Sequence, residues 1–196
     1  AHDDAATLDA KLDALPWSDL RSSKRDLLST YAGRALDLDG VHLELGAEAI
    51  GRAAAKYGAA LAHAVHLHGV LVDTGAPAEI EISVDETGTP TTLVEHAFLA
   101  LELARLDLPV VSLAPRFVGR FEKGVDFRGD LDELIATLDG HARIARTLGP
   151  YKLSLHSGSD KFSVYGPIAE ATHGLVHLKT AGTSYLEALR VVAHVA

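Results

Sequence analysis

Short runs in which apolar and polar residues alternate predict four β-strands in this chain. The clearest is EIEISVDE at 79–86, which follows Pro77 and stops at a Thr-Gly-Thr-Pro turn. Three further runs lie at 110–114, 153–156 and 175–179. Each run ends in polar residues, so the side chains that could form a site gather at one end of the predicted strands.

Segments with apolar residues at every third or fourth position predict the helices. Two are expected within residues 5–36, with Ser18 as the N-cap of the second, before a polar turn and an extended run at 37–45. A long Ala-rich helix is expected from Ala47 to His68, ended by Gly69. Later helices are expected at 93–106 with Thr91 or Thr92 as cap, at 131–148 with Asp130 as cap, and at 184–195 with Leu186, Leu189, Val192 and Val195 facing inward.

This order of elements predicts the fold class. Strands joined by helices pair in parallel, because antiparallel neighbours need only a short turn. The expected fold is therefore α/β, a parallel (β/α) barrel-like sheet of the TIM type within one domain, 1–196. The chain has 196 residues, whereas a complete barrel typically has about 250. Four strand–helix units make half a barrel, so the chain is expected to be part of a larger enzyme.

Composition excludes several partners. The net charge of −9, with no block of Lys or Arg, argues against nucleic-acid binding, which needs a basic face. No apolar run approaches the ~18 residues of a membrane helix. The chain has no cysteine, which excludes thiol chemistry and fits a reducing cytoplasm. An anionic small molecule remains compatible with this composition, because a few local cations decide its binding.

Two histidines at the ends of neighbouring predicted strands are the candidate metal ligands. His156 follows Leu153-Ser154-Leu155, and His177 lies within Leu175–Lys179. Imidazole nitrogens at one level of adjacent strands could share a divalent cation, completed by a carboxylate or water. The alternative is that each is a hydrogen-bonded core histidine. His96 is expected at the surface or in support of a site rather than as a ligand.

Asp85 and Glu86 are the candidate catalytic carboxylates. Adjacent residues on a strand point to opposite faces, so at most one can face the site unless the strand ends there. Parity favours Asp85, because Ile80, Ile82 and Val84 occupy the other face. Glu86 is favoured instead if the strand ends at the Asp-Glu-Thr turn, because its side chain is then no longer bound to the alternation of the strand. The sequence leaves this choice open.

The remaining candidates would bind substrate. Arg116, at a strand end, could hold a carboxylate in a bidentate fork. The loops after the last two strands are small and rich in hydroxyls, so a ligand could approach their backbone N–H groups. They contribute Ser157, Ser159, Asp160, Lys161, Lys179 and Thr180. Lys179 could alternatively form a Schiff base, as in an aldolase.

Four ordered motifs resemble a known family. They are VDET with TPTT and EH at 84–96, VSLAPRFVG at 111–119, LHSGSDKFS at 155–163, and HLKTAGTS at 177–184. Together they are similar to the bacterial tagaturonate epimerases of hexuronate catabolism. Gly166 departs from the tyrosine–proline junction that this family would have there. The resemblance covers the chain from its first helices to its end.

The resemblance implies a metal-dependent, barrel-like enzyme that interconverts tagaturonate and fructuronate. It also implies a longer protein, with upstream strands whose Asp-His motif supplies a base and a metal ligand, and a further C-terminal segment. The inverted carbon is not α to the ketone or the carboxylate, so we expect a retro-aldol route in which a carboxylate moves the hydroxyl proton. The rivals are an aldolase using Lys179 and a non-catalytic sugar-acid-binding half-barrel.

Overall fold

A four-stranded parallel sheet organises the molecule. The structure, a computed structural model, describes residues 3–75, 77–180 and 184–195. The sheet contains β3 (Ile80–Ser83), β4 (Val110–Ala114), β5 (Lys152–Leu155) and β6 (Val176–Leu178), in that spatial order and all parallel. The predicted α/β class and the four parallel strands are confirmed. Because the strands are parallel and paired in register, the segments that follow them leave the sheet at one edge.

Three helices connect the strands. They are α4 (Leu93–Arg105), α5 (Leu131–Leu148) and α6 (Phe162–Ala171). Thr92 and Glu95 form a capping box at the start of α4, and Asp130 accepts two backbone N–H groups at the start of α5. Each pairing satisfies N–H groups that the first helical turn leaves free, which explains why both helices begin where the sequence predicts.

The segment before the sheet differs in part from expectation. The first two helices are α1 (Ala5–Asp13) and α2 (Lys24–Tyr31), and Ser23 rather than Ser18 caps α2. The expected helix up to residue 36 is wrong at its end, because β1 (Arg34–Leu38) and β2 (Val41–Leu45) form an antiparallel hairpin there. Asp39 and Gly40 take positive φ angles of 52° and 88° and form its turn.

The long helix is longer than predicted. α3 (Ala47–Thr74) passes through Gly69 and ends at Gly75, whose φ of 65° lies in the left-handed region. A glycine inside a helix costs about 1 kcal/mol of stability, so Gly69 alone does not end α3. Gly75 ends it, because its left-handed conformation forms the C-terminal cap. The buried residues lie in the first half of α3, from Ile50 to Ala62, which packs against α1, α2 and α4.

Two hydrophobic clusters pack the helices against the sheet, and the pairing of Ile82, Leu113 and Leu153 places their strand residues on the same face. One cluster joins α3 and α4 to the sheet and includes Tyr57, Leu61, Phe98 and Leu113. A second joins α5 and α6 to β5 and includes Leu134, Leu138, Leu153, Leu155 and Val164. Helices therefore cover the outward face of the sheet and leave the strand ends accessible.

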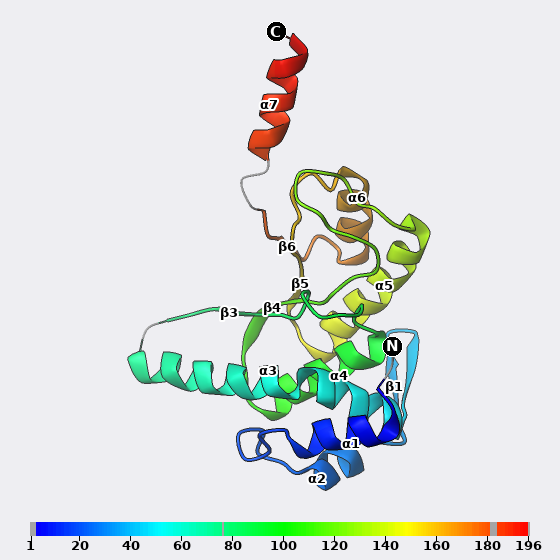
Figure 1. The fold of residues 1–196 in the computed structure, drawn as a ribbon, viewed down its shortest axis with the longest axis vertical. Helices are drawn as coiled ribbons and strands as arrows, with labels where there is room; N and C mark the ends of the chain where they lie inside the picture. Colours follow the sequence, from blue (N-terminus) through cyan, green and yellow to red (C-terminus); the bar gives the residue numbers. More distant parts are fainter. Residues whose placement is uncertain (1–2, 76, 181–183, 196) are drawn as a thin grey trace.

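The last helix, α7 (Ser184–Val195), extends away from this body (Figure 1). The expectation that its apolar residues face inward is wrong for Leu189, Val192 and Val195, which are 46%, 63% and 83% exposed. Helices long and apolar enough to cross a membrane are absent from the part of the chain that the structure describes.

Candidate active site

The carboxylate of Glu81 joins the two histidines at the strand ends. Its Oε1 lies 2.7 Å from His156 Nε2, and its Oε2 lies 2.7 Å from His177 Nδ1. A carboxylate only accepts hydrogen bonds, so each ring donates its N–H to Glu81. The structure thus brings His156 and His177 together around one anion, which the sequence analysis did not include among the candidates.

Polar neighbours keep Glu81 ionised. Ser112 Oγ donates to Glu81 Oε2 at 2.5 Å, and Ser154 Oγ lies 3.2 Å from His177 Nδ1. Partial burial raises the pKa of Glu81, but hydrogen bonds from Ser112, His156, His177 and Ser154 outweigh it and lower the pKa to about 2. Glu81 is therefore a negative centre at every physiological pH.

Asp85 extends this cluster on the other side of His156. Its Oδ1 lies 3.2 Å from His156 Nδ1 and accepts a hydrogen bond from Ser83 Oγ at 2.5 Å. Glu81, Ser83 and Asp85 share one face of β3 and its extension, as parity requires. His156 therefore has a carboxylate beside each ring nitrogen.

A cavity of about 510 Å³ opens beside this cluster. Asp85, Glu86, Arg116, Arg120, His156 and Ser157 are among the residues that line it. Of the two acidic candidates, Glu86 is exposed to this cavity, while Asp85 also contacts His156. The cavity therefore combines carboxylates, an imidazole and guanidinium groups, which suits a polar, anionic ligand.

Lys161 occupies a different place from the one expected. Its side chain is fully buried, and its ammonium donates to the carbonyls of Glu122, Val125 and Ser159 at 2.7, 2.6 and 2.9 Å. Burial lowers its pKa, although Asp160, Asp126 and Glu122 oppose that shift. An ammonium with its three hydrogens already used cannot also bind substrate. Lys161 instead fastens the 119–129 loop to the end of β5.

The other loop candidates lie at different depths. Ser157 lines the cavity, whereas Ser159 and Asp160 are buried and are not among its lining residues. The Lys179 backbone bonds to Leu155 and Gly158, and the side chains of Lys179 and Thr180 are exposed. Residues 181–183 of the expected hydroxyl-rich loop lie outside the described residues.

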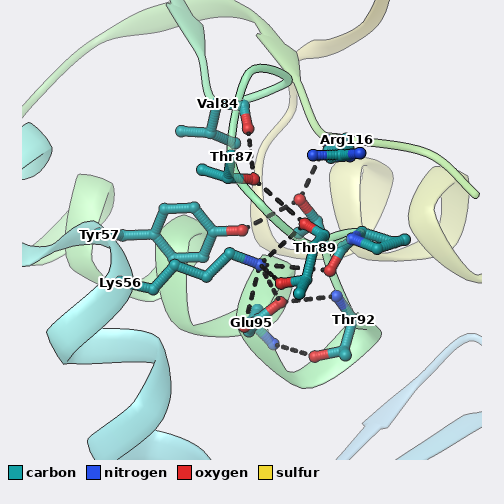
Figure 2. A network of polar contacts seen from close by, with 10 residues as sticks. Lys56, Tyr57, Val84, Thr87, Thr89, Thr92, Glu95 and Arg116 are labelled. Atoms are coloured by element: carbon teal, nitrogen blue, oxygen red, sulfur yellow. Dashed lines mark hydrogen bonds and ion pairs between the residues drawn. The ribbon is translucent and has the colours of Figure 1, made fainter. Parts of the chain in front are cut away.

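A lysine on α3 fixes the turn that carries the two acidic candidates. Lys56 Nζ donates to the carbonyls of Thr89 and Pro90 at 3.2 Å each and pairs with the Glu95 carboxylate at 3.0 Å. Thr87 Oγ1 closes the same turn onto Val84 O at 3.1 Å. Figure 2 shows these contacts converging between α3 and the start of α4. The carboxylates at 85 and 86 thus project from an anchored turn.

Thr91 joins that turn to the next strand end. Its N–H donates to Arg116 O at 2.7 Å, and its Oγ1 accepts from Arg116 N at 3.0 Å and lies 3.0 Å from Tyr57 OH. The backbone of Arg116 is therefore fixed relative to residues 85–92 (Figure 2). This places the predicted carboxylate-binding residue and the acidic candidates in one rigid frame.

Comparison with known proteins decides the family. The family model described as tagaturonate epimerase matches residues 2–196. This chain belongs to the tagaturonate epimerase family. A tagaturonate/fructuronate epimerase from Thermotoga maritima is 44% identical over 176 residues, which are 90% of this chain and 36% of that protein.

Solved structures of the family agree. The native crystal structure of fructuronate-tagaturonate epimerase UxaE from Cohnella laeviribosi matches with a TM-score of 0.86 and 36% identity, over 98% of this chain and 38% of that one. A one-glycerol complex of the same enzyme matches with a TM-score of 0.86 and 35% identity, over 97% of this chain and 38% of that one. The chain therefore spans somewhat more than a third of the length of these relatives.

Glu81 was not predicted as a site residue, and His96 was expected either at the surface or in support of a site. Glu81 lies in the middle of its strand. It precedes Ser83 by two residues and Asp85 by four, and this spacing predicts that all three side chains share one face of the strand. His96 is fully buried rather than at the surface, with its Nδ1 2.9 Å from His141 Nδ1 and its Nε2 2.7 Å from Tyr151 OH. These histidines lie inside the helical layer and line none of the cavity beside Asp85.

Proposed function

We propose that the protein containing this chain is a metal-dependent epimerase that interconverts D-tagaturonate and D-fructuronate. The observation that carries this proposal is the Glu81 carboxylate shared by His156 and His177 beside a cavity with two arginines. Family membership supports the substrate pair, because the relative from Thermotoga maritima is a tagaturonate/fructuronate epimerase. The lack of cysteine is compatible with the cytoplasm, which we propose as its location.

We also propose that the sheet forms part of a closed barrel. Glu81 on β3 and His177 on β6 belong to the two outer strands, yet their side chains meet. Three strand spacings in a flat sheet would separate those backbones by roughly 14 Å. Curvature toward the face that carries both side chains brings them together, as in a (β/α) barrel. By this proposal the 196 residues alone are inactive, since the site is completed elsewhere.

The chemistry of the donor set fits a divalent cation. One carboxylate and two imidazoles are ligand types that zinc and other transition metals take in proteins. Across 3–75, 77–180 and 184–195, no group of three His, Cys, Asp or Glu side chains is placed to hold one ion. Glu81 instead accepts a hydrogen bond directly from each of the two rings. Glu81, His156 and His177 would hold the ion once it replaces those ring protons, and it would act as a Lewis acid on the substrate ketone.

The chain's own groups suit a retro-aldol route. A carboxylate at Asp85 or Glu86 takes the proton of the hydroxyl on the inverted carbon. The bond between that carbon and its neighbour next to the ketone then breaks, leaving an aldehyde and an enolate. The aldehyde turns over, the bond forms again on its other face, and the carboxylate returns the proton. Atoms and charge balance, so no oxidant or reductant is needed.

A Schiff-base aldolase is the weaker alternative. Its lysine would be Lys179, whose side chain is exposed at the end of β6. Lysines that form Schiff bases are activated by desolvation or a neighbouring cation. Borohydride trapping with substrate would reveal this route.

An epimerase assay in labelled water tests the proposal. The natural protein containing this chain should convert D-tagaturonate to D-fructuronate without taking up solvent hydrogen at the inverted carbon. Lack of conversion would refute the function. Conversion with obligatory solvent hydrogen at that carbon would keep the function and refute the retro-aldol route in favour of deprotonation.

A further inference from the structure

Two arginines of one loop are among the residues that line the cavity beside the His156 cluster. Arg116 lies two residues after the end of β4, and Arg120 lies four residues further along. Neither guanidinium forms an ion pair with an acidic side chain in the residues that the structure describes. By contrast, Arg128 of the same loop lies 3.5 Å from the Glu122 carboxylate. Arg116 and Arg120 therefore keep their charge available to a ligand.

The backbone that carries Arg120 is held in place. Its N–H donates to Arg128 O at 2.8 Å, and its carbonyl accepts from Arg128 N at 3.2 Å. The preceding Gly119 has a φ of 81°, and a Cβ there would come within 2.4 Å of the Phe127 ring, so the turn needs a glycine. Lys161 fastens the far side of this loop through Glu122 O and Val125 O.

Aromatic packing supports the same loop. The rings of Phe117 and Phe121 have centroids 6.2 Å apart, and those of Phe121 and Phe127 are 5.2 Å apart. Phe117 is buried in the cluster that contains Leu134 and Leu153. A rigid loop that presents a charged side chain loses little conformational freedom when a ligand binds.

The charges around the cavity give it a positive side. Asp85 is engaged by Ser83 and His156, and Glu122 faces Arg128, so both carboxylates already have partners. Glu86 is the remaining acid on the wall, near the turn that Lys56 anchors. The segment 116–120 therefore forms the cationic wall and the 85–86 turn the acidic wall.

We propose that Arg120 acts with Arg116 as a two-arginine clamp for the substrate carboxylate, and so selects sugar acids over neutral ketoses. This inference rests on the proposed function, which supplies a substrate with a carboxylate at one end and a ketone at the other. The clamp holds the carboxylate at the loop, and the rest of the sugar extends toward His156 and the acidic turn. Arg120 was not among the residues selected from the sequence.

Binding and kinetics of matched variants test the clamp. In the natural protein containing this chain, Arg120→Gln should raise the KM for D-tagaturonate about 10- to 100-fold, the worth of one charge-assisted hydrogen-bonded contact. The kcat should change less than about threefold, since Arg120 does not touch the reacting carbons. Arg120→Lys should recover part of the loss, because a point charge replaces the planar fork. Arg25→Gln, at an exposed position of α2 that is not among the residues lining the cavity, should leave KM unchanged.

Calorimetry separates failure of this inference from failure of the proposed function. Two ligands are compared: D-tagaturonate and the neutral ketohexose that has an alcohol in place of the carboxylate. The native protein should bind D-tagaturonate more tightly, and in Arg120→Gln the two dissociation constants should become similar. If the native protein shows this Arg120-dependent preference but no epimerisation, the clamp stands and the function fails. If Arg120→Gln keeps native affinity for D-tagaturonate, or the native protein binds both sugars equally, the clamp is refuted. Thermal unfolding of each variant confirms that it is folded.

Discussion

Glu81 Oε2 and His177 Nδ1 lie 2.7 Å apart although they come from the first and last strands of the four-stranded sheet. Two strands separate them, so contact requires a sheet that curls toward its inner face. Along the way the same carboxylate contacts Ser112 on β4 and His156 after β5. One side chain thus ties all four strand ends together, and the candidate site depends on that curvature.

Glu81→Gln should abolish most activity. The amide keeps the shape but loses the charge that accepts from both rings, so kcat should fall about 100-fold or more. The measurement is steady-state epimerisation by the natural protein containing this chain. Glu79→Gln is the matched control, because Glu79 is exposed just before the same strand and lines a different cavity. Retention of activity within threefold by Glu81→Gln would contradict the assignment.

The buried pair His96 and His141 should make stability fall in mild acid. Burial lowers the pKa of His141 from 6.5 to about 4, despite an opposing hydrogen bond with the Thr91 backbone, and burial lowers that of His96 too. Below pH 6.5 the unfolded chain therefore binds more protons than the folded one, and stability is lost as pH falls from 6.5 toward 4. For His141 the loss between pH 7 and 5 is about 2 kcal/mol.

Urea unfolding at pH 7 and pH 5 measures this loss. His141→Asn should reduce the drop in unfolding free energy by about 2 kcal/mol, whatever it costs at pH 7. His66→Asn, on the exposed part of α3, should leave the drop as in the native protein. An equal drop in His141→Asn and native protein would show that His141 is not held neutral by burial.

Lys161→Met should destabilise the fold rather than weaken substrate binding alone. It leaves the carbonyls of Glu122, Val125 and Ser159 without their donor, and we expect a loss of about 3 kcal/mol or more in unfolding free energy. Lys123→Met, at an exposed position of the same loop, is the control. A Lys161→Met protein with native stability and weakened substrate affinity would instead favour the direct substrate contact expected from the sequence.

The sequence predicted the sheet because its signals are local. Alternation in 79–86 and the polar residues after each strand depend only on neighbouring positions, and the caps Thr92 and Asp130 lie at the start of their helices. The hairpin at 34–45 was only half predicted, because the helical spacing before it continued into β1. The end of α3 was predicted too early, at Gly69, a glycine that the helix accommodates. The helix ends at Gly75, which takes a left-handed conformation.

The sequence predicted only those contacts of the site that follow from the order of the strands. His156 and His177 end adjacent strands, so their proximity follows from parallel pairing alone. The contact with Glu81 depends on sheet curvature, which no local pattern encodes. The burial of Lys161 depends on a loop that is distant in sequence and folds over it. The carbonyls that Lys161 contacts in this loop belong to Val125 and Glu122, which lie 36 and 39 residues earlier in the chain. Its glycine- and serine-rich surroundings alone resembled an anion-binding loop.

Metal content measured together with activity tests the central proposal that Glu81, His156 and His177 form a metal centre. The natural protein containing this chain should carry divalent metal by mass spectrometry, lose it with its activity on chelation, and regain both when the metal is restored. His156→Ala and His177→Ala should bind less metal in the same assay, while His66→Ala should match the native protein. Full epimerase activity in metal-free protein, or native metal content in both site variants, would contradict the account.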